Sequence, residues 1–88
     1  MKTYKIIFSK QADKFFDKQP KDICNRILSK VNKLAAEPFP VGSKKMEGGD
    51  GLYRIRVGDY RVIYKVANDE LIVLVLKIGN RRNVYLGF

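Results

Sequence analysis

The chain has 88 residues, with 18 lysines and arginines against 9 acidic residues, so its formal net charge is +9 at pH 7. This length allows one domain, residues 1–88, with a single modest core and no room for a second. The charge favours an anionic partner, either nucleic acid or an acidic protein, while the single cysteine excludes an internal disulfide and indicates a reducing, cytoplasmic setting.

The first elements are expected to be a strand and a short helix. Residues 3–8 alternate in polarity, which predicts a strand with Tyr4, Ile6 and Phe8 on one face. The helix should begin at about Ser9, whose hydroxyl can cap its first turn. The apolar run in this strand is too short for the hydrophobic part of a signal peptide, so we expect no processing.

The most regular helical pattern runs from residue 20 to about residue 36. Apolar side chains recur there every three or four positions, which is typical of a helix with one face in the core. Pro20 suits the first turn of such a helix, because its missing N–H would have no partner there. Residues 37–51 contain two prolines and four glycines, which predicts a long connection with brief strand pairing around Lys45.

Three further strands are expected, at residues 52–57, 60–66 and 70–78. Gly58-Asp59 and residues 67–69 are both turn-like and should join them. The last strand, ELIVLVLKI, is apolar on both faces, which predicts a central position in a sheet. Its apolar stretch is far shorter than the roughly 20 residues that span a bilayer, so no membrane association is expected. Residues 83–88 should form a short strand or an extended tail.

These elements predict an α+β fold with the order β-α-α-β-β-β. Two N-terminal helices should pack on one face of a mostly antiparallel, four-stranded sheet. The segment YRIRVGDYRVIY, residues 53–64, then becomes the most informative part of the chain, because it places arginines on the other face of that sheet.

A two-residue Gly-Asp turn sets the register of this hairpin and places Arg56 opposite Arg61. The face expected to pack against the helices carries Tyr53, Ile55, Val57, Tyr60, Val62 and Tyr64. The other face carries Arg54, Arg56 and Arg61. Like charges directly opposite each other destabilise a sheet by a few tenths to about 1 kcal/mol. An anion bound between them would reverse that effect.

The six arginines are unevenly placed, since all but Arg26 lie in the second half of the chain. A guanidinium offers a rigid fork that matches phosphate oxygens, whereas a lysine acts as a hydrated point charge. Arg81 and Tyr85 follow the last strand and could return to the arginine face, where forks and an exposed ring would suit RNA. Alternatively, the hairpin arginines are solvated residues on an open face and Tyr85 is an ordinary core or edge residue.

The residue types and motifs that the chain lacks exclude several kinds of catalytic, metal and cofactor site. The chain has no histidine, which excludes a Ser/His/Asp triad, a Cys/His pair and a histidine metal site. The acidic pairs are better explained by a turn and a helix surface than by a metal cage, and EGGDGL lacks the spacing of a phosphate-binding loop. We therefore expect neither a metal nor a cofactor.

The segment GLYRIRVGDYRVIYKV, followed by an apolar strand and then IGNRRNVY, closely resembles the RelE/ParE superfamily of toxin–antitoxin toxins, on its RelE side. The resemblance runs nearly end to end, because YKIIFSKQADKFFDKQP is similar to the opening strand and helix of that family and LAAEPFP to its helix exit. The combination of YRIRVGDYRVIY with GNRRNVY is more specific than either motif alone.

The resemblance implies a cytoplasmic microbial toxin that is neutralised by a small acidic, RelB-like antitoxin and that binds operator DNA only through the antitoxin complex. It implies an enzyme, a ribosome-dependent mRNA endoribonuclease (mRNA interferase), that cleaves A-site mRNA, halts translation and arrests growth under stress. The RNA's own 2′-OH would attack the adjacent phosphate without a metal.

The matching positions supply the expected site. Arg61, Arg81 and Tyr85 are the catalytic candidates, and Arg54, Arg56, Lys45 and Arg82 are the candidates for binding the substrate. The general base is unassigned, because Asn80 and the Arg54/Arg56 pair stand where many relatives have histidine or lysine, and arginine is a poor proton acceptor. The candidates for this role are Lys44, Lys45, Glu47, Lys77, Tyr85 and the ribosome itself.

Two alternatives remain open. The first is a ParE-like toxin that inhibits DNA gyrase, although that branch lacks the catalytic arginine and tyrosine set. The second is a non-catalytic module that binds RNA or an antitoxin, which the missing base and Asn80 suggest. Such a module would bind RNA with a steep dependence on salt but would not cleave it.

Overall fold

The computed structural model describes residues 3–46, 51–80 and 82. The elements are β1 (Lys5–Phe8), α1 (Lys10–Lys18), α2 (Lys21–Asn32), the 3₁₀ turn η1 (Lys33–Ala35), β2 (Lys44–Lys45), β3 (Leu52–Val57), β4 (Tyr60–Ala67) and β5 (Ile72–Asn80). The predicted α+β class and the predicted order of elements are confirmed. None of the helices in these ranges is long and apolar enough to cross a membrane.

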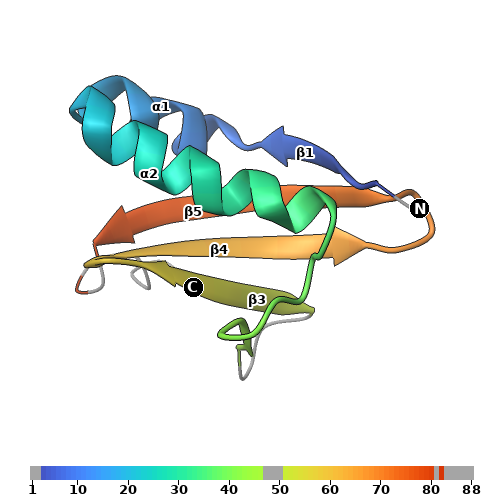
Figure 1. The fold of residues 1–88 in the computed structure, drawn as a ribbon. Coiled ribbons are helices and arrows are strands. Elements are labelled where there is room, and N and C mark those ends of the chain that lie inside the picture. The colour runs from blue at the N-terminus through green and yellow to red at the C-terminus, as the bar shows by residue number, and fades with distance from the viewer. Residues whose placement is uncertain (1–2, 47–50, 81, 83–88) are drawn as a thin grey trace.

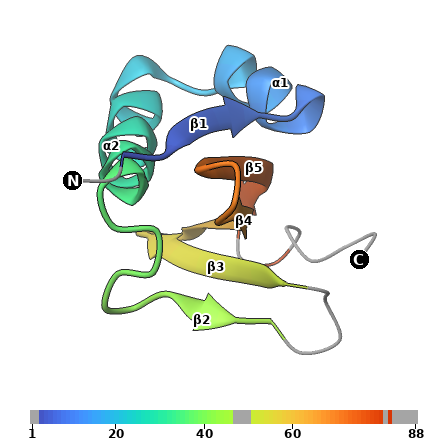
Figure 2. The same ribbon diagram turned by 90° about the vertical axis from the view of Figure 1, so that its right-hand side faces the viewer.

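The strands form one five-stranded sheet in the order β1-β5-β4-β3-β2 (Figure 1). β1 runs parallel to β5, and the other neighbouring pairs are antiparallel. β5 therefore lies between two strands, as its two apolar faces predicted. Both helices cover the same face of the sheet (Figure 2). The fifth strand beyond the four predicted is the two-residue β2, at the place where pairing around Lys45 was expected.

Helix α1 is tied to β5 by side chains of its first turn. The Ser9 hydroxyl accepts a hydrogen bond from the backbone N–H of Ala12, which caps the helix, and donates one to the Leu76 carbonyl at 2.6 Å. The Gln11 side chain donates to the Ile78 carbonyl at 3.2 Å and accepts from the Ile78 N–H at 3.0 Å. These bonds hold the helix against the strand that leads into the GNRR segment.

A β-bulge in β5 explains why the Leu76 carbonyl needs an outside partner. Leu76 has no partner in the β4–β5 ladder, where the register shifts by one residue. The extra residue lets Val75 and Ile78 both turn toward the helices, and both are fully buried. Ser9 supplies the hydrogen bond that a regular ladder would have provided.

The turn between β4 and β5 is longer than predicted. It spans residues 68–71, not 67–69, and β5 begins at Ile72. Leu71 has a φ of 55°, which is uncommon for a residue with a side chain. Its carbonyl accepts a hydrogen bond from the Lys5 N–H at 2.8 Å, so pairing with β1 holds the end of this turn in place.

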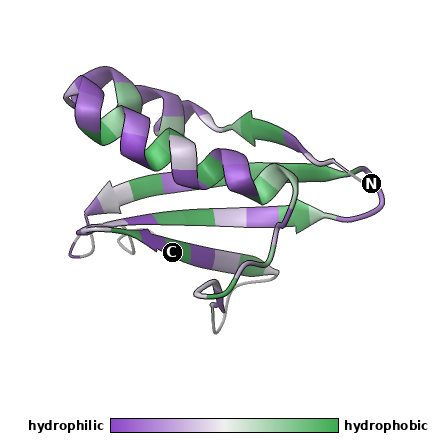
Figure 3. Ribbon diagram, in the orientation of Figure 1, coloured by the Kyte–Doolittle hydropathy of each residue, from purple (hydrophilic) through white to green (hydrophobic). Residues whose placement is uncertain are grey.

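The core lies between the two helices and the sheet. Its fully buried members come from every layer: Ala12, Ile27, Val31, Leu34, Val62, Tyr64, Val73, Val75 and Ile78. Figure 3 shows apolar and polar positions interleaved along α2, whose buried residues are both apolar. Ile27 and Val31 stand one helical turn apart on that apolar stripe, which is the spacing that the sequence predicted.

The β3–β4 hairpin has the predicted register, with Arg56 opposite Arg61 and Val57 opposite Tyr60. Gly58 has a φ of 59°, which a two-residue hairpin turn requires at its first central position and which favours glycine. The predicted division of the hairpin into an apolar face and an arginine face is therefore confirmed.

Candidate functional site

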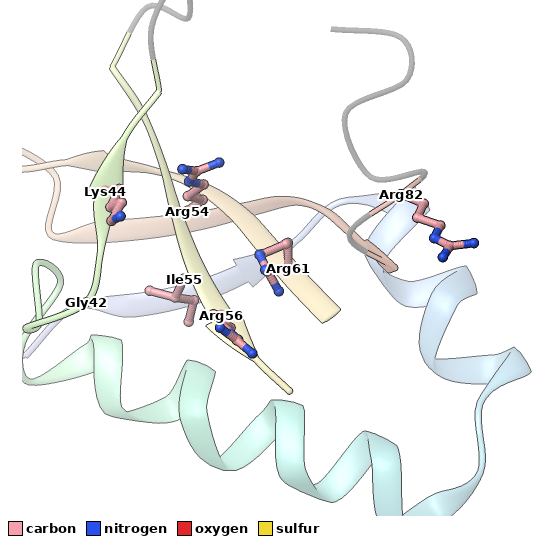
Figure 4. Close-up of a pocket in the computed structure, with 7 residues that line it drawn as sticks. All are labelled: Gly42, Lys44, Arg54, Ile55, Arg56, Arg61 and Arg82. Atoms are coloured by element: carbon pink, nitrogen blue, oxygen red, sulfur yellow. The ribbon is translucent and has the colours of Figure 1, made fainter. Parts of the chain in front are cut away.

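A groove of about 580 Å³ lies beside the hairpin and is lined mainly by cationic side chains. The lining residues are Gly42, Lys44, Arg54, Ile55, Arg56, Arg61 and Arg82. The sheet brings them together from four separate segments of the chain (Figure 4). We call this feature the arginine groove. Five cations in one groove create a strong local attraction for anions.

Arg56 and Arg61 are held side by side by one backbone oxygen. The Gly58 carbonyl accepts a hydrogen bond from Arg56 Nε at 3.1 Å and another from an Arg61 Nη at 3.3 Å. Arg61 also donates to the Tyr60 carbonyl at 3.1 Å. The partial negative charge of these carbonyls offsets part of the repulsion between the two guanidinium groups. Each guanidinium has five N–H donors, so most of them stay available to a ligand.

Lys44, and not the predicted Lys45, lies on the arginine face. Lys44 is paired with Arg54 in the β2–β3 ladder, whereas Lys45 is paired with Tyr53. Directly opposed residues of an antiparallel pair share a face, so Lys45 belongs with the tyrosines on the helix side of the sheet. Lys44 is therefore the lysine of this strand that lines the groove.

The arginine face also contains one buried apolar residue. Ile63 is 0% exposed, yet it lies outside the cluster that packs under the helices. Its cross-strand neighbours are Arg54 and Lys77, so it sits in the middle of the basic face. This part of the sheet is therefore less open than the alternation of side chains predicted.

The predicted residues after β5 are only partly within the described ranges. Arg82 lines the groove, and its backbone N–H donates a hydrogen bond to the side-chain oxygen of Asn80 at 3.1 Å. Its side chain stands apart from the hairpin arginines (Figure 4). The predicted catalytic residues Arg81 and Tyr85 lie outside the described residues.

The hairpin groups suit a ligand with several oxygens and negative charge. Charge-assisted hydrogen bonds from guanidinium groups are short and strong, and paired forks recognise phosphate with defined geometry. The hydrogen bonds that orient Arg56 and Arg61 go to backbone carbonyls, so both groups keep their positive charge for a ligand. The groove therefore has the charge and the donor groups that suit a phosphate.

The sequence of the chain matches a known protein family over most of its length. Residues 6–85 match the family described as the ParE toxin of the type II toxin–antitoxin system parDE. The match includes both helices, all five strands but one residue of β1, and the hairpin arginines. The chain belongs to the RelE/ParE superfamily of type II toxins. The resemblance seen in its motifs is thus confirmed.

Individual relatives place the chain on the RelE side of the RelE/ParE superfamily. It is 30% identical over 80 residues to a RelE-like toxin protein of Escherichia coli, covering 89% of this chain and 83% of that protein. It is 38% identical over 56 residues to a RelE1 toxin of Methanocaldococcus jannaschii, a stretch that covers 64% of this chain and only 60% of that relative.

A solved structure supports the same placement. The crystal structure of an archaeal RelE–RelB complex from Pyrococcus horikoshii contains a chain that is 36% identical to this one, with a TM-score of 0.80. The superposition covers 93% of this chain and 99% of the other. This protein therefore has the RelE fold over nearly its whole length.

Two lining residues of this RelE-family toxin were not among the site residues predicted from the sequence, namely Gly42 and Ile55. Gly42 has a φ of 97° in the connection before β2, and Ile55 is 2% exposed while its neighbours on both sides are arginines. No local pattern pointed to Gly42, because its position depends on where the long connection crosses the sheet.

Proposed function

We propose that this RelE-family toxin is a ribosome-dependent mRNA endoribonuclease. The observation that carries the proposal is the arginine groove, in which Arg56 and Arg61 share the Gly58 carbonyl and Lys44 and Arg54 stand on the neighbouring strands. A cationic groove of this kind suits RNA phosphate, and the identity to RelE toxins supports mRNA as the substrate.

The reaction needs little from the protein beyond charge and position. The RNA 2′ oxygen forms a bond to the adjacent phosphorus, the bond from phosphorus to the 5′ oxygen breaks, and the proton lost from the 2′-OH is balanced by one gained at the leaving oxygen. Negative charge accumulates on the phosphate oxygens as the new bond forms. Arg61 and Arg56, already oriented by Gly58, would stabilise that charge, with Arg81 as a further donor.

Arginine is unsuited to accept the proton of the 2′-OH, because a guanidinium stays protonated at any physiological pH. Lys44 is the lysine among the described residues that line the groove. We assign it the base role ahead of Lys77 because it lines the groove, with Tyr85 orienting the nucleotide by stacking.

The proposed partners follow from the charge and from the relatives. An acidic, RelB-like antitoxin would neutralise the toxin by covering its basic surface, as the RelE–RelB pairing in the Pyrococcus horikoshii crystal suggests. The ribosome and its mRNA would be the target in the cytoplasm, and operator DNA would be contacted through the antitoxin complex.

Primer extension on mRNA from cells expressing the toxin tests the proposal. The wild type should cut translated messages, whereas Arg61→Ala and Arg81→Ala should each reduce cleavage by about 100-fold or more, because each removes a proposed donor to the charge that develops on the phosphate. Lys21→Ala, a change in an exposed lysine on α2, is the matched control and should cut normally. Intact mRNA during growth arrest by the wild type would overturn the proposal.

Inhibition of DNA gyrase is the second candidate, and the ParE name of the matching family is the observation that favours it. In that case arrest would be accompanied by gyrase-dependent DNA breaks while translation continued. A non-catalytic binding module would give a third result. The affinity of the purified toxin for RNA would fall steeply as the salt concentration rises, and mRNA on programmed ribosomes would stay uncut.

A further inference from the structure

A second groove, of about 380 Å³, adjoins the arginine groove. It is lined by Lys30, Val41, Gly42, Ile55, Arg56 and Gly58. Three of these residues, Gly42, Ile55 and Arg56, line the arginine groove as well. The two hollows therefore share a wall at β3, and the second one reaches Lys30 of helix α2.

Arg26 of α2 reaches the hairpin turn at the end of this second groove. One of its terminal guanidinium nitrogens lies 3.2 Å from the place where a side-chain carbon would begin at Gly58. The approach is possible because Gly58 has no side chain. Since the carbonyl of the same glycine accepts from Arg56 and Arg61, three guanidinium groups from three elements meet at one turn.

Lys30 continues this basic surface along the helix. It stands four residues after Arg26, so the two side chains lie on the same flank of α2, about 6 Å apart along its axis. Like charges at this spacing weaken an isolated helix by a few tenths of a kcal/mol. The separation is similar to one nucleotide step along an extended single strand of RNA.

Among the described residues, no strand lies along the edge of β3 between the two hollows. β2 pairs with β3 at Tyr53 and Arg54, and the described part of β2 does not extend alongside Ile55 and the residues that follow. A chain bound in the arginine groove can therefore pass around this edge of β3 toward α2.

We infer that Arg26 and Lys30 form a flanking subsite for the sugar–phosphate backbone of the RNA strand that leaves the arginine groove. The inference rests on the proposed function for its ligand class, single-stranded RNA. Phosphate is favoured over a carboxylate peptide because Arg56 lines both grooves, Lys30 lines the second one, and Arg26 and Lys30 follow each other along α2 at a helical rise of about 6 Å. A guanidinium fork also matches the oxygens of a phosphate.

The test measures the affinity of the purified toxin for RNA of two lengths by fluorescence anisotropy across a salt series. The probes are a trinucleotide, which fills only the arginine groove, and a decanucleotide, which can also reach α2. Both carry 2′-O-methyl groups, so the attacking hydroxyl is blocked and cleavage does not interfere. The variants are Arg26→Gln, Lys30→Gln and the control Lys21→Gln, which lies on the opposite flank of the buried stripe of α2.

Arg26→Gln should weaken binding of the decanucleotide by about tenfold, since it removes a charge-assisted hydrogen bond. It should also reduce the slope of log K against log salt by about 0.7, as expected for one lost phosphate contact on a single strand. Lys30→Gln should act in the same direction, while Lys21→Gln should leave both quantities unchanged. None of these variants should alter trinucleotide binding.

Three outcomes would overturn the inference. An equal loss for both RNA lengths would mean that Arg26 acts through the Gly58 turn on the arginine groove. No loss for either length would mean that the second groove does not bind RNA, and a loss confined to binding of an acidic antitoxin would assign this surface to a protein partner. A matched melting temperature for wild type and variants confirms that each variant is folded.

The result is separable from that of the proposed function. If the wild type fails to cut mRNA, the proposed activity is wrong, yet the dependence on RNA length can still be measured. If mRNA is cut normally and Arg26→Gln binds both RNA lengths as the wild type does, only the flanking subsite is wrong.

Discussion

The two faces of the β3–β4 hairpin differ sharply in what they contact. On the helix side, Ile55, Val62 and Tyr64 are between 0% and 2% exposed. On the other side, Arg56 and Arg61 donate hydrogen bonds to one carbonyl and line the arginine groove. Because side chains alternate along a strand, one backbone serves both purposes. The comparison teaches that changes on the helix side should affect stability, and changes on the arginine side should affect binding.

Ile55→Ala gives the largest expected effect and tests this division where it is least obvious. Ile55 lines both grooves but is 2% exposed, so its side chain belongs mainly to the core. Removing it should lower the free energy of unfolding by about 3 kcal/mol, as for other buried isoleucines that are truncated to alanine. Urea denaturation followed by circular dichroism measures the loss.

Arg61→Gln is the matched change on the other face. It should alter the free energy of unfolding by less than about 1 kcal/mol, because the arginine is partly exposed and its hydrogen bonds go to the turn next to it. It should nevertheless weaken RNA binding, whereas folded Ile55→Ala should bind RNA as the wild type does. A small stability loss in Ile55→Ala, together with weakened RNA binding, would show that the two faces are not separate.

The hairpin was predictable because its information is local. The two-residue Gly-Asp turn sets the register, and the alternation of types then assigns each side chain to a face. The paired helices, the central position of β5 and the family were predictable for similar reasons, since each depends on a continuous motif or a regular period. The site residues Arg54, Arg56 and Arg61 were therefore placed together before the structure was known.

The features that the sequence did not reveal depend on contacts between distant segments. Lys45 was predicted to bind the substrate and Lys44 was only one of the candidate bases, because a shift of one residue in a two-residue strand moves a side chain to the other face. The bulge at Leu76 is completed by Ser9, far away in the chain. The sequence showed Arg26 only as the one arginine in the first half of the chain. Its approach to Gly58 was not predicted, because it depends on how α2 packs on the sheet.

Tyr64→Phe gives a smaller effect on the helix side of the hairpin. The Tyr64 hydroxyl donates a hydrogen bond to the Pro38 carbonyl at 2.7 Å and so fastens the long connection to the sheet. Removing the hydroxyl should lower the free energy of unfolding by about 1 kcal/mol at neutral pH. RNA binding should be unaffected, and a loss of RNA binding without a loss of stability would contradict the division of the two faces.

The pH dependence of Tyr64→Phe provides an independent check. Burial raises the pKa of the Tyr64 hydroxyl above its ordinary value of 10.0, and a hydrogen bond with Ser43 lowers it in part. The unfolded chain therefore loses this proton at a lower pH than the folded chain does. The resulting stabilisation is complete below about pH 10 and is lost as the pH rises through the folded-state pKa. Alkaline denaturation curves should show this loss in the wild type and not in Tyr64→Phe.

Sulfate binding on the arginine face should give the smallest effect on stability. If Arg56 and Arg61 form an anion site, sulfate that binds between them stabilises the folded state by about 0.4 kcal/mol when its concentration equals its Kd. The melting temperature of the wild type should rise with sulfate more steeply than that of an Arg56→Gln/Arg61→Gln double variant. Thermal denaturation at constant ionic strength, with chloride replaced by sulfate, measures the difference.

The double variant separates this binding from a general effect of the salt. Sulfate is excluded from protein surfaces and raises the stability of most folded proteins, and this contribution should act equally on both forms. Only the additional rise in the wild type reports an anion held by the two arginines. Equal slopes would mean that the two arginines, which both donate to the Gly58 carbonyl, do not hold sulfate between them. A steeper slope in the wild type would show that the arginine face is less stable without its ligand, whereas the helix face is complete without one.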